Sequence, residues 1–119
     1  MVIKFNHLKM SERLRRNQPN LNSLRRMNRE ARKSYLKRCN QEFIDCLCEC
    51  SKNLLKGNVP VSTAQFKKLK PYKKVLRKLS NNKVSCEHRR KLLVRQTGSG
   101  FLPALIGPLI ALAASLFAN

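Results

Sequence analysis

Residues 40–57 read NQEFIDCLCECSKNLLKG, and this stretch decides the fold. Asn40 or Gln41 is placed to begin a helix, and Gly57 stands where a left-handed C-terminal cap is wanted. The stretch also holds three of the six acidic residues, so it is the least basic helix and the expected centre of the core. Its inward stripe recurs at helical spacing and consists of Phe43, Ile44, Leu47, Ser51, Leu54 and Leu55.

Further helices are predicted on both sides of this one. Upstream, apolar residues spaced by three and four predict one amphipathic basic helix over residues 21–38. Downstream, Ser62 and Gln65 have capping-box spacing for a third helix, which Pro71 should kink or split. Ser85 is placed to cap a last helix through Arg95. We therefore expect an all-α fold, a small bundle of about four short amphipathic basic helices without a β-sheet.

The two ends differ from this helical body. Residues 1–20 show no regular pattern and Pro19 should end any early helix, so they are predicted to form a mobile basic arm with at most one short helix near residues 11–16. All charges lie before residue 96, and residues 96–100, QTGSG, are typical of a flexible hinge. Residues 101–119 form an apolar segment expected to lie apart from the body. The predicted organisation is arm 1–20, body 21–95, hinge 96–100 and tail 101–119.

The charge balance points to a polyanionic partner. The chain has 26 Lys and Arg against 6 Asp and Glu, a formal net charge of +20 in 119 residues. Such self-repulsion is relieved by nucleic acid, and twenty net charges match the phosphates of about ten base pairs of DNA. Candidate phosphate-binding residues are Arg13, Arg15, Arg16, Arg25, Arg26, Arg29, Arg32, Lys33, Lys37, Arg38, Lys67, Lys68, Lys70, Lys73, Lys74, Arg77, Lys78, Arg89, Arg90, Lys91 and Arg95.

The apolar tail keeps a membrane alternative open. As one helix, residues 101–118 would reach about 27 Å, against a hydrocarbon core of about 30 Å. Pro103, Gly107 and Pro108 should interrupt it, so only 109–118 would form an unbroken helix, too short to span. In this alternative the body binds anionic head groups while the tail meets a bilayer or partner through Phe101, Leu102, Leu105, Ile106, Leu109, Ile110, Leu112, Leu116 and Phe117.

A third alternative is a sequence-specific regulator. A helix, a short turn and the basic helix over residues 85–95 follow one another in the order of a helix-turn-helix motif. Two short amphipathic helices joined by a turn have the same appearance without any such role. Non-specific phosphate contact needs only charge density, and we therefore prefer it.

The thiols carry no clear chemical motif. Cys46, Cys50, Cys86 and His88 form a conceivable zinc-ligand set, but the alternative is that the cysteines are small buried hydrophobes. Five cysteines in a Lys-rich chain without a signal-peptide pattern indicate reduced thiols in the cytosol or nucleus. No nucleophile, base and oxyanion-site set is apparent, so neither an enzyme nor a cofactor is predicted.

Residues 95–114, RQTGSGFLPALIGPLIALAA, resemble the C-terminal part of the adenoviral core protein precursor mu, or protein X. The longer Lys- and Arg-rich body is more similar to the protein-X-like products of adintoviruses and Maverick or Polinton elements. The resemblance implies a DNA-condensing core protein of a virion, present in the host nucleus, that contacts capsid protein or membrane through its tail. It also implies a processing site for an adenoviral-type cysteine protease at Gln96, Gly98, Ser99 and Gly100, cut after Ser99.

Overall fold

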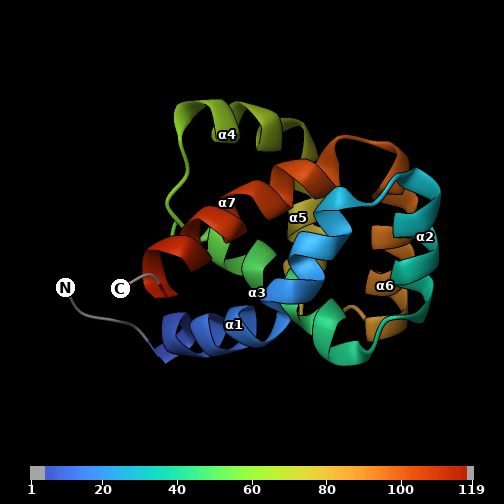
Figure 1. Ribbon diagram of the computed structural model, residues 1–119, viewed down its shortest axis with the longest axis horizontal. Coiled ribbons are helices and arrows are strands. Elements are labelled where there is room, and N and C mark those ends of the chain that lie inside the picture. Colours follow the sequence, from blue (N-terminus) through green and yellow to red (C-terminus); the bar gives the residue numbers. More distant parts are fainter. Residues whose placement is uncertain (1–4, 118–119) are drawn as a thin grey trace.

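The protein was analysed as a computed structural model, which describes residues 5–117 and the side chains of residues 12–112. The described residues form seven α-helices and two short 3-10 turns, and no strand (Figure 1). The predicted all-α class is confirmed, with more helices than the expected four. In chain order they are α1 (Phe5–Arg26), α2 (Arg29–Arg38), α3 (Gln41–Leu55), α4 (Thr63–Leu69), η1 (Lys70–Tyr72), α5 (Lys73–Ser80), α6 (Cys86–Arg95), η2 (Gln96–Gly98) and α7 (Phe101–Phe117).

Helix α3 lies at the centre of the core, as its sequence predicted. The Asn40 side chain accepts a hydrogen bond from the Phe43 N–H at its start, and Phe43, Ile44 and Leu47 are at most 1% exposed. At its end Gly57 has φ +75°. The Gly57 N–H donates to Leu54 O and the Asn58 N–H to Asn53 O, which together form a Schellman motif.

The prediction of a mobile arm over residues 1–20 is wrong for residues 5–20. These residues belong to α1, which continues through Pro19, while residues 1–4 lie outside the described residues. Leu14, Leu21 and Leu24 are at most 1% exposed, and burial of these leucines against α3 and α7 outweighs the backbone hydrogen bond that Pro19 removes. Figure 1 shows α1 changing direction along its length, as expected of a helix containing proline.

The predicted single helix over residues 21–38 is also wrong, because the chain breaks between α1 and α2. Asn28 caps α2 by accepting a hydrogen bond from the Ala31 N–H. Arg32 donates to Leu24 O and Arg25 O at the end of α1, at 3.0 and 2.8 Å. These side chains satisfy backbone groups on both sides of the junction, so two helices replace one.

The split at Pro71 and the local caps are confirmed. Helix α4 begins with a capping box between Ser62 and Gln65, and the chain then passes through η1, which contains Pro71, into α5. Ser85 caps α6 by accepting from the His88 N–H at 3.2 Å. The segments predicted as the third and fourth helices thus become α4, α5 and α6.

The C-terminal segment is part of the core and not a separate tail. Helix α7 crosses the molecule between α1 and α4 (Figure 1), and Phe101, Leu102, Leu105, Ile106 and Leu109 are fully buried. Leu112 is buried and Ile110 is partly buried, whereas the side chains of Leu116 and Phe117 lie outside the described residues.

The expected interruption of α7 at its prolines and glycine does not occur. Pro103 stands in the first turn, where its missing N–H has no helical partner in any case. Pro108 removes one internal hydrogen bond, but it is buried with its apolar neighbours, and Gly107 faces Gln65 of α4. Within residues 5–117 no helix is both long enough and apolar enough to cross a membrane.

Candidate nucleic-acid interface

The strongest concentration of positive charge lies on α4, η1 and α5. Leu69, Leu76 and Leu79 turn this segment toward the core, which leaves its cations on the outer side. We call these exposed cations the α4–α5 ridge: Lys67, Lys68, Lys70, Lys73, Lys74, Arg77 and Lys78. Residues 50–86 contain no Asp or Glu, so no acidic residue of this segment offsets the ridge.

The acidic side chains are used elsewhere, chiefly between α1 and α3. Arg13 Nε lies 3.1 Å from Glu42 Oε1, and Arg13 also pairs with Glu49. Arg16 Nη2 lies 3.1 Å from the same Glu42 oxygen, and Asn17 donates to the other. Among residues 12–112 only Arg13 and Arg16 form ion pairs, so these two of the predicted phosphate-binding residues already have anionic partners.

The pKa of Glu42 reflects this environment. Partial burial alone would raise the pKa, but hydrogen bonds from Asn17 and Arg16 and the charge of Arg13 outweigh burial and hold it below its ordinary value. Glu42 therefore stays ionised and joins α3 to α1.

Three of the candidate arginines satisfy helix ends. Arg32 caps α1, as described above, and Arg90 Nη1 donates to Leu36 O and Cys39 O at 2.9 and 2.7 Å at the end of α2. Arg89 Nη2 donates to Asn81 O at the end of α5. All three are half-buried and hold helix ends, so they are less available to a polyanion at the protein surface.

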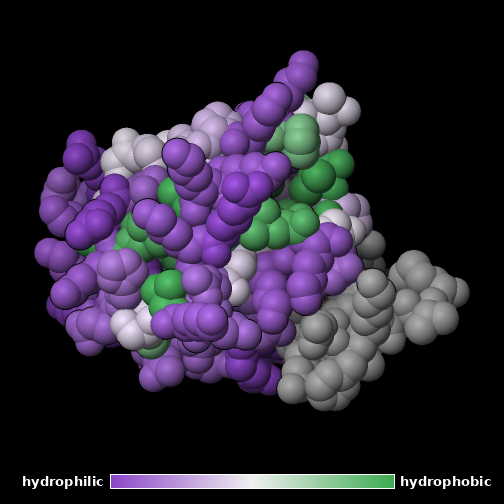
Figure 2. All heavy atoms as spheres, turned by 180° about the vertical axis from the view of Figure 1, so that it is seen from behind, coloured by the Kyte–Doolittle hydropathy of each residue, from purple (hydrophilic) through white to green (hydrophobic). Residues whose placement is uncertain are grey.

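The remaining candidates are exposed and spread over several elements. Hydrophilic residues cover most of the face in Figure 2, and hydrophobic ones form small separate patches. This spread over several helices suits contact with a charged backbone better than recognition of base edges. The exposed candidates outside the ridge are Arg15, Arg25, Arg26, Arg29, Lys33, Lys37, Arg38, Lys91 and Arg95.

Helix α6, the segment considered for a helix-turn-helix, packs against α2, α3 and α5. Leu92 and Leu93 are buried, and Arg89 and Arg90 bind neighbouring helix ends. Its exposed stripe consists of Glu87, His88, Lys91 and Arg95.

The hinge residues form a structured connection. Thr97 is buried and its hydroxyl donates to Val94 O at 2.8 Å. Ser99 N–H donates to Gln96 O at 3.1 Å, and Gly100 N–H donates to the Tyr72 hydroxyl at 3.1 Å. Tyr72 also packs edge-on against Phe101, with ring centroids 5.4 Å apart. The four predicted protease-recognition residues thus lie in this connection, and backbone groups of Gln96, Ser99 and Gly100 are hydrogen-bonded.

The thiols are mostly in the core. Cys46, Cys48 and Cys50 are buried, whereas Cys86 is half-buried and His88 is exposed. Burial raises the pKa of Cys48 to about 12, and the contact with Cys46, followed by burial, raises the pKa of Cys50. Within the described part of the chain, no group of three or more His, Cys, Asp or Glu side chains is arranged to hold a metal ion.

Comparison with known proteins assigns this chain to no family. No family model, curated protein or solved structure matches the chain significantly. The assignment of a role therefore depends on the residues themselves.

One polar site was missed by the sequence prediction. Lys52, Lys56, Asn82 and Arg89 line a cavity between α3 and the connection from α5 to α6. Asp45, Glu49, Lys52 and Lys56 recur at helical spacing along α3 and the residue after it, and this second, polar stripe was the available signal. Asn82 and Arg89, which face this stripe across the cavity, come from later in the chain. Tertiary packing brings them there, and a helical period does not predict it.

Proposed function

We propose that this protein binds double-stranded DNA non-specifically, through phosphate contacts made by its exposed lysines and arginines. The observation that carries this proposal is the α4–α5 ridge, seven exposed cations in a segment without an acidic residue. A folded helical body holds these cations apart from the core and spaced along one surface. When these cations neutralise phosphates, counterions are released into solution. The affinity for DNA is therefore highest at low salt.

A role in condensing a viral genome is the natural extension of this proposal. The net charge of +20 and the spread of exposed cations over α1, α2, α4, α5 and α6 favour contact with several DNA segments at once. The viral setting itself depends on the resemblance of residues 95–114 to the mu precursor.

The two other functions gain no support from the geometry. The apolar side chains that a membrane role requires, such as Leu105 and Ile106, contact the protein core. A helix-turn-helix regulator requires free side chains near the start of α6 to read bases, but Arg89 and Arg90 bind neighbouring helix ends. Non-specific binding of DNA requires neither an exposed apolar segment nor a recognition helix.

The test is binding of the full chain to two unrelated duplexes of equal length over a salt series, measured by fluorescence anisotropy. We expect equal affinities for the two sequences and a linear fall of log affinity with log salt concentration. A triple variant, Lys67→Gln, Lys70→Gln and Lys74→Gln, should flatten the slope by about 0.9 for each phosphate that is no longer neutralised.

The matched control replaces the same three lysines with arginine, which keeps the charges and should keep the slope. An affinity that barely changes with salt would overturn the proposal. So would a triple Gln variant whose slope equals that of the wild type.

A further inference from the structure

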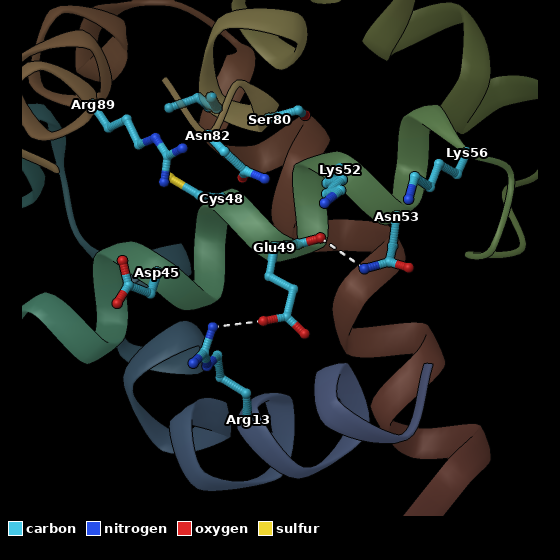
Figure 3. Close-up of a pocket in the computed structure, with 11 residues that line it drawn as sticks. Arg13, Asp45, Cys48, Glu49, Lys52, Asn53, Lys56, Ser80, Asn82 and Arg89 are labelled. Atoms are coloured by element: carbon cyan, nitrogen blue, oxygen red, sulfur yellow. Dashed lines mark hydrogen bonds and ion pairs between the residues drawn. The ribbon is translucent and has the colours of Figure 1, made fainter. Parts of the chain in front are cut away.

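A polar cavity lies between α3 and the turn at Asn82, and none of the ridge residues lines it. Its volume is about 310 Å³. Figure 3 shows Arg89 beside Cys48 and Asn82 on one side, and Arg13 with Glu49 on the other. Lys52 and Lys56 line the same cavity from α3 and the residue after it. Side chains of four helices and one turn thus build this recess.

The charges that line the cavity favour an anion. Arg13 and Glu49 form an ion pair and largely cancel each other. Three cations then remain, Lys52, Lys56 and Arg89, against a single carboxylate, Asp45. The cavity is therefore positive on balance, although α3 is the most acidic helix in the chain.

Arg89 supplies a planar guanidinium group to the cavity wall, and the fold uses only some of its donors. Arg89 Nη2 donates to Asn81 O, but Arg89 Nε is buried and has no hydrogen-bond partner. A buried donor left without a partner costs about 1–3 kcal/mol, so native structures usually supply an acceptor. The guanidinium group is planar, and its Nε and Nη donors match two oxygens of one phosphate.

We propose that this cavity binds a phosphate group, with its oxygens contacting the Arg89 guanidinium group, Lys52 and Asn82. The free phosphate dianion and a terminal phosphate of a nucleotide share this chemistry, as does a phosphate of a nucleic-acid strand. The site does not depend on the proposed function, because the α4–α5 ridge contributes none of these residues.

The experiment titrates full-length protein with inorganic phosphate at constant ionic strength and follows the Arg89 Nε–Hε signal by NMR. The signal is assigned from its loss in Arg89→Lys, which retains the charge. We expect a saturable shift of this signal, with half-saturation about tenfold higher in Lys52→Gln, since that variant lacks one charged hydrogen bond. Lys74→Gln removes the same charge from the ridge and should leave half-saturation unchanged.

Shifts that grow linearly without saturating would overturn the proposal, as would equal weakening in Lys52→Gln and Lys74→Gln. Because Arg89 also caps α5, Arg89→Lys could fail to fold, and Asn82→Ala provides a second variant that should weaken phosphate binding. Competition then identifies the source of the phosphate. Displacement by adenosine monophosphate but not adenosine indicates a nucleotide, and displacement by a DNA duplex indicates a strand phosphate.

Discussion

At the scale of single residues, three roles recur among the positive side chains that the structure describes. Arg32, Arg89 and Arg90 bind backbone carbonyls at helix ends, and Arg13 and Arg16 bind carboxylates. The ridge residues do neither and face outward. Charge content alone therefore overstates the number of cations that a polyanion could contact. The hydrogen-bond partners of each side chain show which cations are already bound within the protein and which are free for a polyanion.

Gly57 provides a prediction about backbone conformation. Its φ of +75° is rarely adopted by residues with a Cβ, although a Cβ built there would meet no neighbour. We expect Gly57→Ala to lower the free energy of unfolding by about 1 kcal/mol, measured by urea denaturation. Gly57→Asn is the matched control and should cost less, because Asn tolerates this conformation better. Equal stability of all three proteins would contradict the Schellman geometry.

Glu42 provides a prediction about pH. Because its pKa is lowered in the folded protein, its stabilising contribution is complete above the unfolded pKa and is lost as pH falls through the folded value. Urea denaturation should show wild type more stable than Glu42→Gln at pH 7, with the difference shrinking below about pH 4. Glu30→Gln, at an exposed position, should show little difference at either pH. A difference independent of pH would contradict the ionic role of Glu42.

Residue-scale features were predictable where the signal is local. The caps at Asn40, Gly57, Ser62 and Ser85 occur as expected, since each cap bonds within a few residues of itself. The partner of Arg90, 51 residues away at Cys39, has no such local signal. The cavity at Arg89 was unpredictable for the same reason.

At the scale of elements, proline positions were the main source of error. Pro71 splits a helix as expected, whereas Pro19 and Pro108 lie within continuous helices. Pro108 is buried in the core, whereas Pro19 and Pro71 are both exposed. In α1 the leucines on either side of Pro19, Leu14 and Leu21, are buried against other helices. This packing offsets the hydrogen bond that the proline removes, and a rule based on sequence alone does not include it.

Helix α7 provides a test of its place in the core. Leu105 is fully buried, so we expect Leu105→Ala to lower the free energy of unfolding by about 2–5 kcal/mol. Ala111 is exposed on the same helix, and Ala111→Ser should change it by only a few tenths of a kcal/mol. Thermal or urea unfolding distinguishes the two. Similar small effects for both variants would show that α7 is dispensable for the core.

The expected cleavage after Ser99 can be tested against the same helix. A cut there would detach α7, and the Gly100 N–H is bound to Tyr72. We expect an adenoviral-type protease to leave the native chain at its intact mass and to cut Leu105→Ala faster, because α7 then detaches more often. Gly100→Val removes a recognition residue and should block cleavage in both backgrounds. Rapid cleavage of the native chain would contradict this dependence on unfolding.

At the scale of the whole molecule, the net charge opposes folding. The chain carries a net charge of +20, and its radius of gyration is 13.3 Å, little more than the Debye length of about 10 Å at 0.1 M salt. The repulsion between exposed cations is therefore long enough in range to act across the surface, and ions that screen it stabilise the folded state.

Salt should thus act on stability and on DNA binding with opposite signs. We expect the melting temperature to rise between low and physiological salt, while DNA affinity falls over the same range. The triple Gln variant of the ridge should melt higher than wild type at low salt and show a smaller rise. Differential scanning fluorimetry measures the melting temperature of the wild type and of the variant at each salt concentration. A melting temperature that falls with added salt would show that attractive pairs, such as those at Glu42, outweigh the repulsion.

The packing of α1 against α7 also affects how the chain can acquire its fold during synthesis. Helix α1, the first described helix, packs against α7, the last, and together they complete a single core. Leu14 and Leu109 are both fully buried in it. While a ribosome still holds the C-terminal segment in its exit tunnel, α1 and α3 have emerged with their apolar faces uncovered. Folding of this core must therefore wait until α7 leaves the tunnel, and until then the basic nascent chain lies beside ribosomal RNA, itself a polyanion.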